Sequence, residues 1–304
     1  MSDAPRFIAV IGRSGQVASA LADLADATPA RICFFARPDF DLAEPGALVA
    51  ALRAMAPDTV INAAGYTAVD RAEDEPQRAY AVNAQGPAAL AAYCASAGAR
   101  LIHLSTDYVF DGRAAGPYAE TAPVNPLGVY GASKLAGERA VRSACARAVI
   151  LRTAWVFSAV GKNFVTTMIR VARETGALRV VNDQTGGPTP AAVIAAACLS
   201  IAAQCRREPD RPGGLYHLSG TPPVTWYGFA RTIVDTAAPL IGRPATLTPI
   251  TTTEFAAKAA RPANSVLDCA RIARDFGIGP ADWRQGLRDV IAVLAAQREA
   301  AGVS

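Results

Sequence analysis

The sequence predicts an α/β protein with a doubly wound parallel sheet, followed by a smaller, α-rich C-terminal lobe. The first half of the chain alternates short apolar runs with segments of helical spacing, which is the pattern of repeated βα units. These runs are apolar throughout, as expected of strands that are buried on both faces. The first run leads directly into a turn containing Gly12 and Gly15. Together these observations favour a parallel sheet over an antiparallel one.

The elements follow in a regular order. The apolar runs predict strands at residues 6–12, 31–37, 58–65, 99–110 and 147–157. Helical spacing predicts helices at residues 16–27, 44–57 and 75–98, and a further helix that carries Tyr130. Beyond residue 152 the pattern loosens into helices around 163–175, 190–205, 225–238 and 284–299. Late strands at 178–182 and 214–220 are expected, one or both of them extending the sheet.

Composition excludes several classes of protein. The chain has 304 residues, 51% of them hydrophobic, and a net charge of only +4 from scattered Lys and Arg residues, which does not favour binding to nucleic acid. Six cysteines without a CxxC pair, and two histidines inside predicted strands, favour buried thiols in a reducing cytoplasm and no metal site. The N-terminal apolar run is too short for a signal peptide, and no segment suits a membrane span.

The glycine turn after the first predicted strand fits a dinucleotide phosphate. Gly12 permits a sharp turn, Gly15 lets the backbone approach a pyrophosphate, and the following helix offers its free N–H groups. The glycines alone also fit an ordinary tight βα turn. The third predicted strand, however, ends in small residues that leave room for a cofactor. The residues predicted to bind the cofactor here are Gly12, Arg13, Ser14, Gly15, Gln16, Val17, Ala63, Ala64 and Gly65.

Arg37 indicates which cofactor is used. A site for NAD usually has an acidic residue at the end of the second strand, but this chain has Arg37 there and no carboxylate immediately beside it. A guanidinium suits the 2′-phosphate of NADPH, and Arg13 offers a second contact. NADPH is therefore favoured, with NADH still possible, and Arg37 as a solvated surface residue is the alternative. Asp41 and Leu42 are expected to border the adenine.

Tyr130 and Lys134 lie four positions apart in "LGVYGASKLAGERA" and so share a helix face. Thr106 and Asp107 follow the fourth predicted strand, at the sheet edge where ligands bind. An ammonium about 4 Å from a phenol is worth about 4 kcal/mol, enough to lower the pKa of the phenol by roughly three units. The pattern predicts that Tyr130 donates a proton during carbonyl reduction, with Thr106 holding the carbonyl oxygen. Tyr-x-x-x-Lys on its own is common by chance.

The stretches "GRSGQVA", "TAVDRAE", "LSTDYVFDG", "NPLGVYGASKLAGE" and "NDQTGGPT" carry a resemblance through nearly the whole chain. The sequence resembles the extended short-chain dehydrogenase/reductases, which have a Rossmann fold, and within them the dTDP-4-dehydrorhamnose reductase family. The resemblance implies that NAD(P)H reduces the 4-keto group of dTDP-6-deoxy-L-lyxo-4-hexulose. It makes Tyr130 the proton donor and Thr106 the usual catalytic Ser or Thr. It also makes Lys134 the residue that binds the nicotinamide ribose and lowers the pKa of the tyrosine.

The resemblance also implies how the nucleotide-sugar is held. Residues 1–152 form the NAD(P)-binding domain, to which residues 177–200 return, and 153–304 mainly form the substrate lobe. Thr106, Asp107 and Trp155 are expected to border the sugar, with Asn163, Gln184 and Arg261 as weaker candidates. Asn163 as a helix cap and Arg261 in a salt bridge, at the surface or between the lobes, remain alternatives.

Assembly and exact activity stay open at this stage. Some family members form dimers bridged by magnesium through glutamates, but the corresponding segments "QVASALADL" and "PTPAAVIA" contain none, and a hard cation needs oxygen ligands. A metal-bridged dimer is not expected, whereas a monomer and a homodimer both fit. Two other functions remain: a reductase of another nucleotide-linked 4-keto-6-deoxy sugar, and a non-catalytic regulatory binding subunit.

Overall fold

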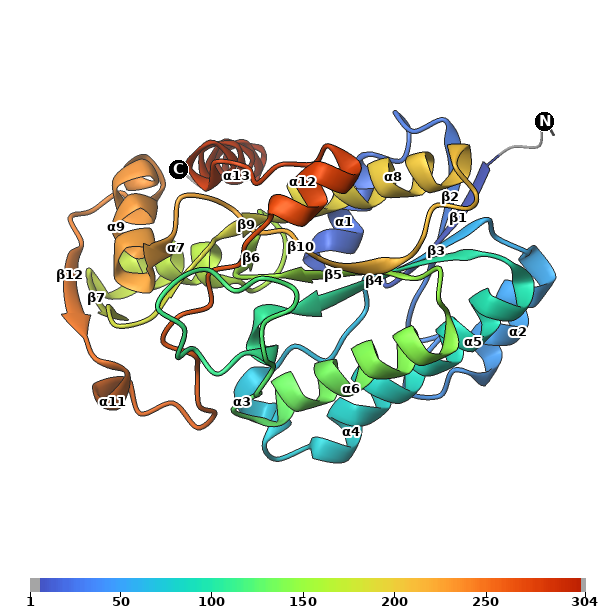
Figure 1. Cartoon of the computed structure of the whole chain (residues 1–304). Helices are drawn as coiled ribbons and strands as arrows, with labels where there is room; N and C mark the ends of the chain where they lie inside the picture. Colours follow the sequence, from blue (N-terminus) through green and yellow to red (C-terminus); the bar gives the residue numbers. More distant parts are fainter. Residues whose placement is uncertain (1–5, 302–304) are drawn as a thin grey trace.

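The computed structural model describes residues 6–301, and at its centre lies a six-stranded parallel sheet in the order β10-β5-β4-β3-β1-β2 (Figure 1). The strands are β1 (Arg6–Ile11), β2 (Ala30–Phe35), β3 (Thr59–Asn62), β4 (Arg100–Thr106), β5 (Val149–Thr153) and β10 (Gly214–His217). The predicted doubly wound sheet is confirmed. The winding reverses between β1 and β3, which creates a crevice at the carboxyl ends of these strands.

Helices cover both faces of the sheet, as Figure 1 shows. One face carries α1 (Gln16–Asp23), α8 (Ala191–Arg207) and α12 (Ala270–Phe276). The other carries α2 (Gly46–Met55), α5 (Gly86–Ala97) and α6 (Val129–Ala144). Val10 and Ile61 pack into the first layer, whereas their neighbours Ala9 and Val60 pack into the second. Burial on both sides explains why large apolar residues occupy successive positions in these strands.

The helix predicted at residues 75–98 is interrupted. It comprises α4 (Pro76–Tyr80), a π-helical turn η1 (Ala81–Gln85) and α5. Glycine is required immediately after the turn, because a Cβ atom on Gly86 would lie 2.3 Å from the carbonyl oxygen of Leu42. Single π-helical turns often occur at functional sites, and this one contains the buried Asn83.

The second lobe has its own core. Its main elements are α7 (Phe164–Thr175), β7 (Ala177–Val181), α9 (Trp226–Thr236), β12 (Thr246–Ile250) and α13 (Trp283–Ala300). Of the two late strands, one or both of which were expected to extend the central sheet, β10 does so, whereas β7 pairs in parallel with β12. The burial pattern explains the difference: three of the four β10 residues are buried, whereas β7 alternates between exposed and buried positions.

Shorter elements complete the chain and were not predicted individually. They are α3 (Val69–Ala72), η2 (Asp107–Val109), β6 (Val156–Phe157), β8 (Thr185–Gly186), β9 (Thr189–Pro190), β11 (Val224–Thr225), α10 (Ala238–Ile241) and α11 (Thr252–Phe255). Helix α8 packs on α1 and so returns the chain to the sheet; the division near residue 152 is retained as a proposal. Within residues 6–301, no helix has the length and apolar character needed to cross a membrane.

Candidate active site

The turn after β1 leaves the amino end of α1 open. Gly12 has a φ of +112°, which favours glycine, and its N–H donates to the carbonyl oxygen of Phe35 at 2.8 Å. Gly15 is the N-cap and provides no side-chain cap, and a Cβ atom placed on it would meet nothing within 4 Å. The first N–H groups of α1 therefore have no side-chain cap, and there is open space beside Gly15, an arrangement that fits the phosphates of a dinucleotide.

The side chains of this turn point in different directions. Arg13 and Ser14 are exposed, whereas Val17 is buried in the core. Gln16 links the turn to the second lobe: its Nε2 donates to the carbonyl oxygen of Val156 at 3.2 Å, and its Oε1 accepts from the hydroxyl of Ser158 at 3.0 Å. Contacts across the crevice thus begin at the glycine turn itself.

Residues after β2 divide into exposed and packed positions. Arg37 is exposed, as a contact to a 2′-phosphate requires. Asp41 accepts from Arg78 Nη2 at 2.6 Å and from the N–H of Ala43 at 2.9 Å. Leu42 is 5% exposed and packs against Gly86. Asp41 and Leu42 therefore have structural partners, and the contact with adenine stays a prediction.

The loop after β3 brings the cofactor side of the crevice next to Lys134. The N–H of Ala63 donates to the carbonyl oxygen of Ile11 at 3.0 Å, and Ala64 is half-buried beside it. A Cβ atom on Gly65 would lie 3.8 Å from Lys134 Nζ. Ala63, Ala64 and Gly65, which were predicted to leave room for a cofactor, thus lie between the glycine turn and the ammonium group of Lys134.

Thr106, Tyr130 and Lys134 meet where β4 and α6 approach one another. The Thr106 hydroxyl, at the end of β4, donates to Asp107 Oδ1 at 3.0 Å and accepts from the N–H of Tyr108 at 3.2 Å. Tyr130 lies in the first turn of α6 and packs edge-to-face on Tyr108, with 5.4 Å between the ring centroids. Lys134 Nζ donates to the carbonyl oxygen of Leu104 at 2.6 Å.

The predicted effect of Lys134 on Tyr130 is wrong in this structure. Burial raises the pKa of Tyr130 to about 12, with the charge of Asp107 acting in the same direction and a hydrogen bond with Thr106 opposing it. Lys134 is itself only 5% exposed, and burial lowers its pKa to about 8 against the opposing effect of Glu138. Desolvation outweighs the attraction expected from helical spacing.

Asp107 is a buried carboxyl group with an unused oxygen. Its side chain is 2% exposed, and its Oδ2 has no hydrogen-bond partner within the described chain. Burial raises the pKa of Asp107 to about 6, although hydrogen bonds with Ser265 and Thr106 act to lower it. Because buried polar atoms normally have partners, this oxygen fits the hydroxyl group of a ligand.

Trp155 has the strained backbone that is often found at functional sites. Its φ is +48°, an uncommon value for a residue with a large side chain. The indole stacks on Trp226, with 3.4 Å between ring centroids and 6° between ring planes. The indole also contacts Gly186, where a Cβ atom would lie only 2.4 Å from the indole. Trp155 is therefore held by packing from the second lobe.

The three weaker candidates have structural partners. Asn163 caps α7: its Oδ1 accepts from the N–H of Thr166, and its Nδ2 donates to two backbone carbonyl oxygens. Gln184 is buried, and its Nε2 donates to the hydroxyl of Thr252 at 3.0 Å. Arg261 Nη2 pairs with Asp70 Oδ2 at 2.8 Å and so joins the lobes. The structure thus favours the alternatives for Asn163 and Arg261.

Several residues of the site were not assigned from the sequence. Tyr108 packs on Tyr130, and Asn83 Nδ2 donates to the hydroxyl of Ser133, which in turn donates to the carbonyl oxygen of Tyr130. Glu138 lies one turn beyond Lys134. Of these residues, Asn83 could have been found from the sequence, because it is a polar residue in an otherwise alanine-rich helix. Within residues 6–301, no group of three or more His, Cys, Asp or Glu side chains could hold a metal ion.

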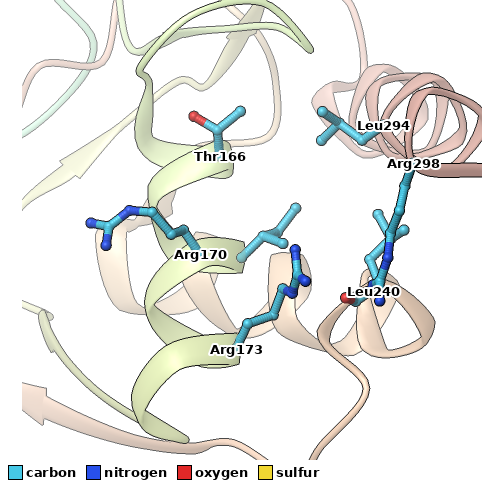
Figure 2. Close-up of a pocket in the computed structure, with 7 residues that line it drawn as sticks. Thr166, Arg170, Arg173, Leu240, Leu294 and Arg298 are labelled. Atoms are coloured by element: carbon cyan, nitrogen blue, oxygen red, sulfur yellow. Dashed lines mark hydrogen bonds between the residues drawn. The ribbon is translucent and has the colours of Figure 1, made fainter. Parts of the chain in front are cut away.

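A cavity of about 280 Å³ lies outside this site, between α7, α10 and α13 (Figure 2). Ile169, Leu240 and Leu294 provide apolar lining, with arginines at the rim. Arg170 pairs with Glu174 at 2.5 Å and points away from the cavity in Figure 2. None of the lining residues belongs to the Thr106–Tyr130–Lys134 group, so the cavity is not part of the candidate active site.

The fold and the site together define the class of short-chain dehydrogenases and reductases, because a Rossmann sheet carries a glycine turn, a Thr and a Tyr-x-x-x-Lys pair at one edge. The family model of the RmlD substrate binding domain matches residues 6–296, and the chain belongs to this family.

Relatives cover both lobes. The dTDP-4-dehydrorhamnose reductase of Sinorhizobium fredii is 43% identical over 289 residues, 94% of this chain and 97% of that protein. The enzyme of the same name from Escherichia coli is 39% identical over 83% of this chain and 84% of its own length. The crystal structure of the Bacillus anthracis dTDP-4-dehydrorhamnose reductase in complex with NADP has a TM-score of 0.88 and 31% identity, covering 95% of this chain and 100% of that one.

Proposed function

We propose that this chain reduces the 4-keto group of dTDP-6-deoxy-L-lyxo-4-hexulose, also called dTDP-4-dehydro-L-rhamnose, to give dTDP-L-rhamnose. The observation that carries the proposal is the 43% identity to a dTDP-4-dehydrorhamnose reductase over 94% of the chain. A match of this extent includes the lobe that distinguishes one sugar nucleotide from another. NADPH is the proposed reductant, because Arg37 is exposed after β2 and a relative's crystal structure holds NADP.

The charges and open N–H groups at the crevice support the proposed cofactor. The open amino end of α1 would receive the pyrophosphate, Arg13 and Arg37 the 2′-phosphate, and Lys134 the nicotinamide ribose. When bound, the reduced nicotinamide supplies the hydride. Positioning the carbonyl group and donating the proton are left to side chains at the carboxyl end of β4 and the first turn of α6.

Tyr130 is the proposed proton donor. The Thr106 hydroxyl positions the sugar carbonyl, and the Tyr130 hydroxyl gives its proton to the oxygen that becomes negative as the carbonyl is reduced. A pKa of about 12 keeps this phenol protonated at neutral pH. Because an alkoxide is a stronger base than a phenolate, the transfer remains favourable, so reduction does not require a lowered tyrosine pKa.

The remaining contacts would fix the sugar. The unused Oδ2 of Asp107 is proposed to accept from a sugar hydroxyl, and the Trp155 indole to pack on the ring. Gln184 stays a candidate for the nucleotide, and Arg261, which pairs with Asp70, is the weaker one. A cytoplasmic location, and a monomer or a homodimer without a metal bridge, are retained as proposals.

The experiment is NADPH oxidation by the wild-type protein with the 4-keto sugar nucleotide prepared in situ. We expect Tyr130→Phe to lower kcat by about 100-fold or more, the scale of general acid catalysis, while NADPH binding persists. Tyr80→Phe, at an exposed tyrosine outside the site, is the matched control. A folded wild-type protein that binds NADPH but oxidises none would contradict the rhamnose assignment. It would favour another 4-keto-6-deoxy sugar, tested in the same assay, or a regulatory subunit.

A further inference from the structure

Three polar side chains follow one face of α6 at intervals of four residues: Tyr130, Lys134 and Glu138. Tyr130 and Lys134 have proposed roles, but Glu138 has none. It is only 2% exposed, and burying a carboxylate costs free energy unless charged or polar partners compensate. The presence of Glu138 directly behind the lysine therefore requires a physical reason.

Glu138 is held in place by three donors from two strands. Arg152 Nε donates to its Oε1 at 2.8 Å, and Arg152 Nη2 to its Oε2 at 2.7 Å, which makes the contact bidentate. The Ser105 hydroxyl donates to Oε1 at 2.5 Å. The Arg152 guanidinium carbon is itself 5.0 Å from the centroid of the Phe110 ring. The carboxylate therefore has a fixed position at the base of the site.

The groups that β4 presents to Lys134 are neutral, so the Glu138 carboxylate is the nearby charge that can favour a charged lysine. Strand β4 offers the carbonyl oxygen of Leu104 and the ring of His103. Burial keeps the pKa of His103 well below its usual value, so this ring is neutral at physiological pH. Burial and the charge of Arg152 likewise lower the pKa of His217, which contacts Arg152, to about 3. Among the described residues, Glu138 is the charged group that opposes the effect of burial on Lys134.

We propose that Glu138 is a positioning residue: held by Arg152 and Ser105, its carboxylate keeps the ammonium of Lys134 charged on the cofactor side of the site. The inference rests on the proposed function in assigning Lys134 to NADPH. It adds that the pH range over which Lys134 acts depends on a charge from outside the proposed catalytic group. Burial lowers the pKa of Lys134 to about 8 even with Glu138 present, so the margin at neutral pH is small.

The first variant to test is Glu138→Gln. It leaves Arg152 buried without a counterion, which by itself destabilises a protein strongly. The double variant Glu138→Gln/Arg152→Met removes both charges and is the informative one, because it separates the loss of the carboxylate from a stranded guanidinium. Glu174→Gln, which breaks an exposed pair with Arg170, is the control. Circular dichroism and thermal unfolding verify that each variant is folded.

The measured quantity is NADPH affinity, followed by fluorescence across pH, with kcat/KM measured in parallel. Wild-type affinity is expected to fall as the pH rises through about 8. In the double variant the same fall is expected at a lower pH, because the carboxylate that opposes the effect of burial on Lys134 is gone. Below that range its affinity remains within about threefold of wild type, which a general loss of structure would not produce.

Two outcomes distinguish failure of the inference from failure of the proposed function. A folded double variant whose affinity falls at the wild-type pH overturns the inference, since Glu138 then only packs. A wild-type protein that binds NADPH with this pH dependence but reduces no 4-keto sugar overturns the proposed function instead. The binding data alone decide whether Glu138 sets the charge of Lys134.

Discussion

Replacing Asp107 with asparagine should change the pH dependence of stability. Burial raises the pKa of this carboxyl group from 3.8 to about 6, so the folded protein binds the proton more tightly than the unfolded chain. The contribution to stability is therefore present below about pH 4 and lost as the pH rises through about 6. The shift of about two units corresponds to about 3 kcal/mol lost by pH 8, and roughly half of that by pH 5.

Asp107→Asn cannot ionise, so its stability relative to wild type, measured as the difference between their free energies of unfolding, should be about 1.5 kcal/mol greater at pH 8 than at pH 5. Urea unfolding at the two pH values measures this difference. A constant cost, such as burial of the asparagine N–H groups where Oδ2 has no partner, cancels in the comparison. Asp289→Asn, at an exposed site, is the control. An equal effect of Asp107→Asn at both pH values would refute the reasoning, because ionisation would then not be what burial penalises.

Two further substitutions test the cofactor and sugar contacts. Arg37→Ala should lower kcat/KM for NADPH by about tenfold and leave kcat/KM for NADH unaffected, because a charge-assisted hydrogen bond at an exposed site is worth at least this much. Arg53→Ala on α2 is the control, and equal losses with both cofactors would contradict the assignment. Gly186→Ala places a methyl group 2.4 Å from the Trp155 indole, which should cost about 1–3 kcal/mol of stability, raise KM for the sugar and alter tryptophan fluorescence. Gly116→Ala, where a Cβ atom meets nothing within 4 Å, should do none of these; an unchanged KM for Gly186→Ala would remove Trp155 from the sugar site.

The predictable part of the fold is the part that is buried on both faces. Strands β3, β4 and β5 are buried along their whole length, so each contains a cluster of large apolar residues, although β4 and β5 also bury polar side chains such as His103 and Arg152. Strand β12 could not be identified in this way, since Thr246, Thr248 and Pro249 are exposed. Its partner β7 lies more than sixty residues earlier in the chain. Pairing of two half-exposed strands at that separation leaves no local pattern.

The site divides along the same line. Gly12, Tyr130 and Lys134 could be found because a turn and one helix face are local features. The partners of Glu138 could not, because Ser105 and Arg152 reach it from two different strands. Tyr130 and Lys134 do lie four residues apart on α6, as the spacing predicts, but the direction of the pKa shift of Tyr130 depends on how much water the folded chain removes. Desolvation is a property of tertiary packing and has no signature in a single helix.

The buried charges at this sheet edge differ in whether the chain compensates them. Glu138 and Arg152 neutralise one another through two hydrogen bonds. Within residues 6–301, neither Lys134 nor Asp107 forms an ion pair. Burial moves their pKa values towards neutrality from opposite sides, to about 8 and about 6, and the charge of Glu138 opposes the shift of Lys134 only in part. Both groups are still charged at pH 7, and the free-energy cost of burying these charges is only partly offset by partners within the folded chain. Perturbed groups of this kind concentrate where a ligand supplies the missing partner. We therefore expect cofactor and sugar to complete the side of the site that holds Lys134 and Asp107, whereas the protein itself completes the side that holds Glu138 and Arg152.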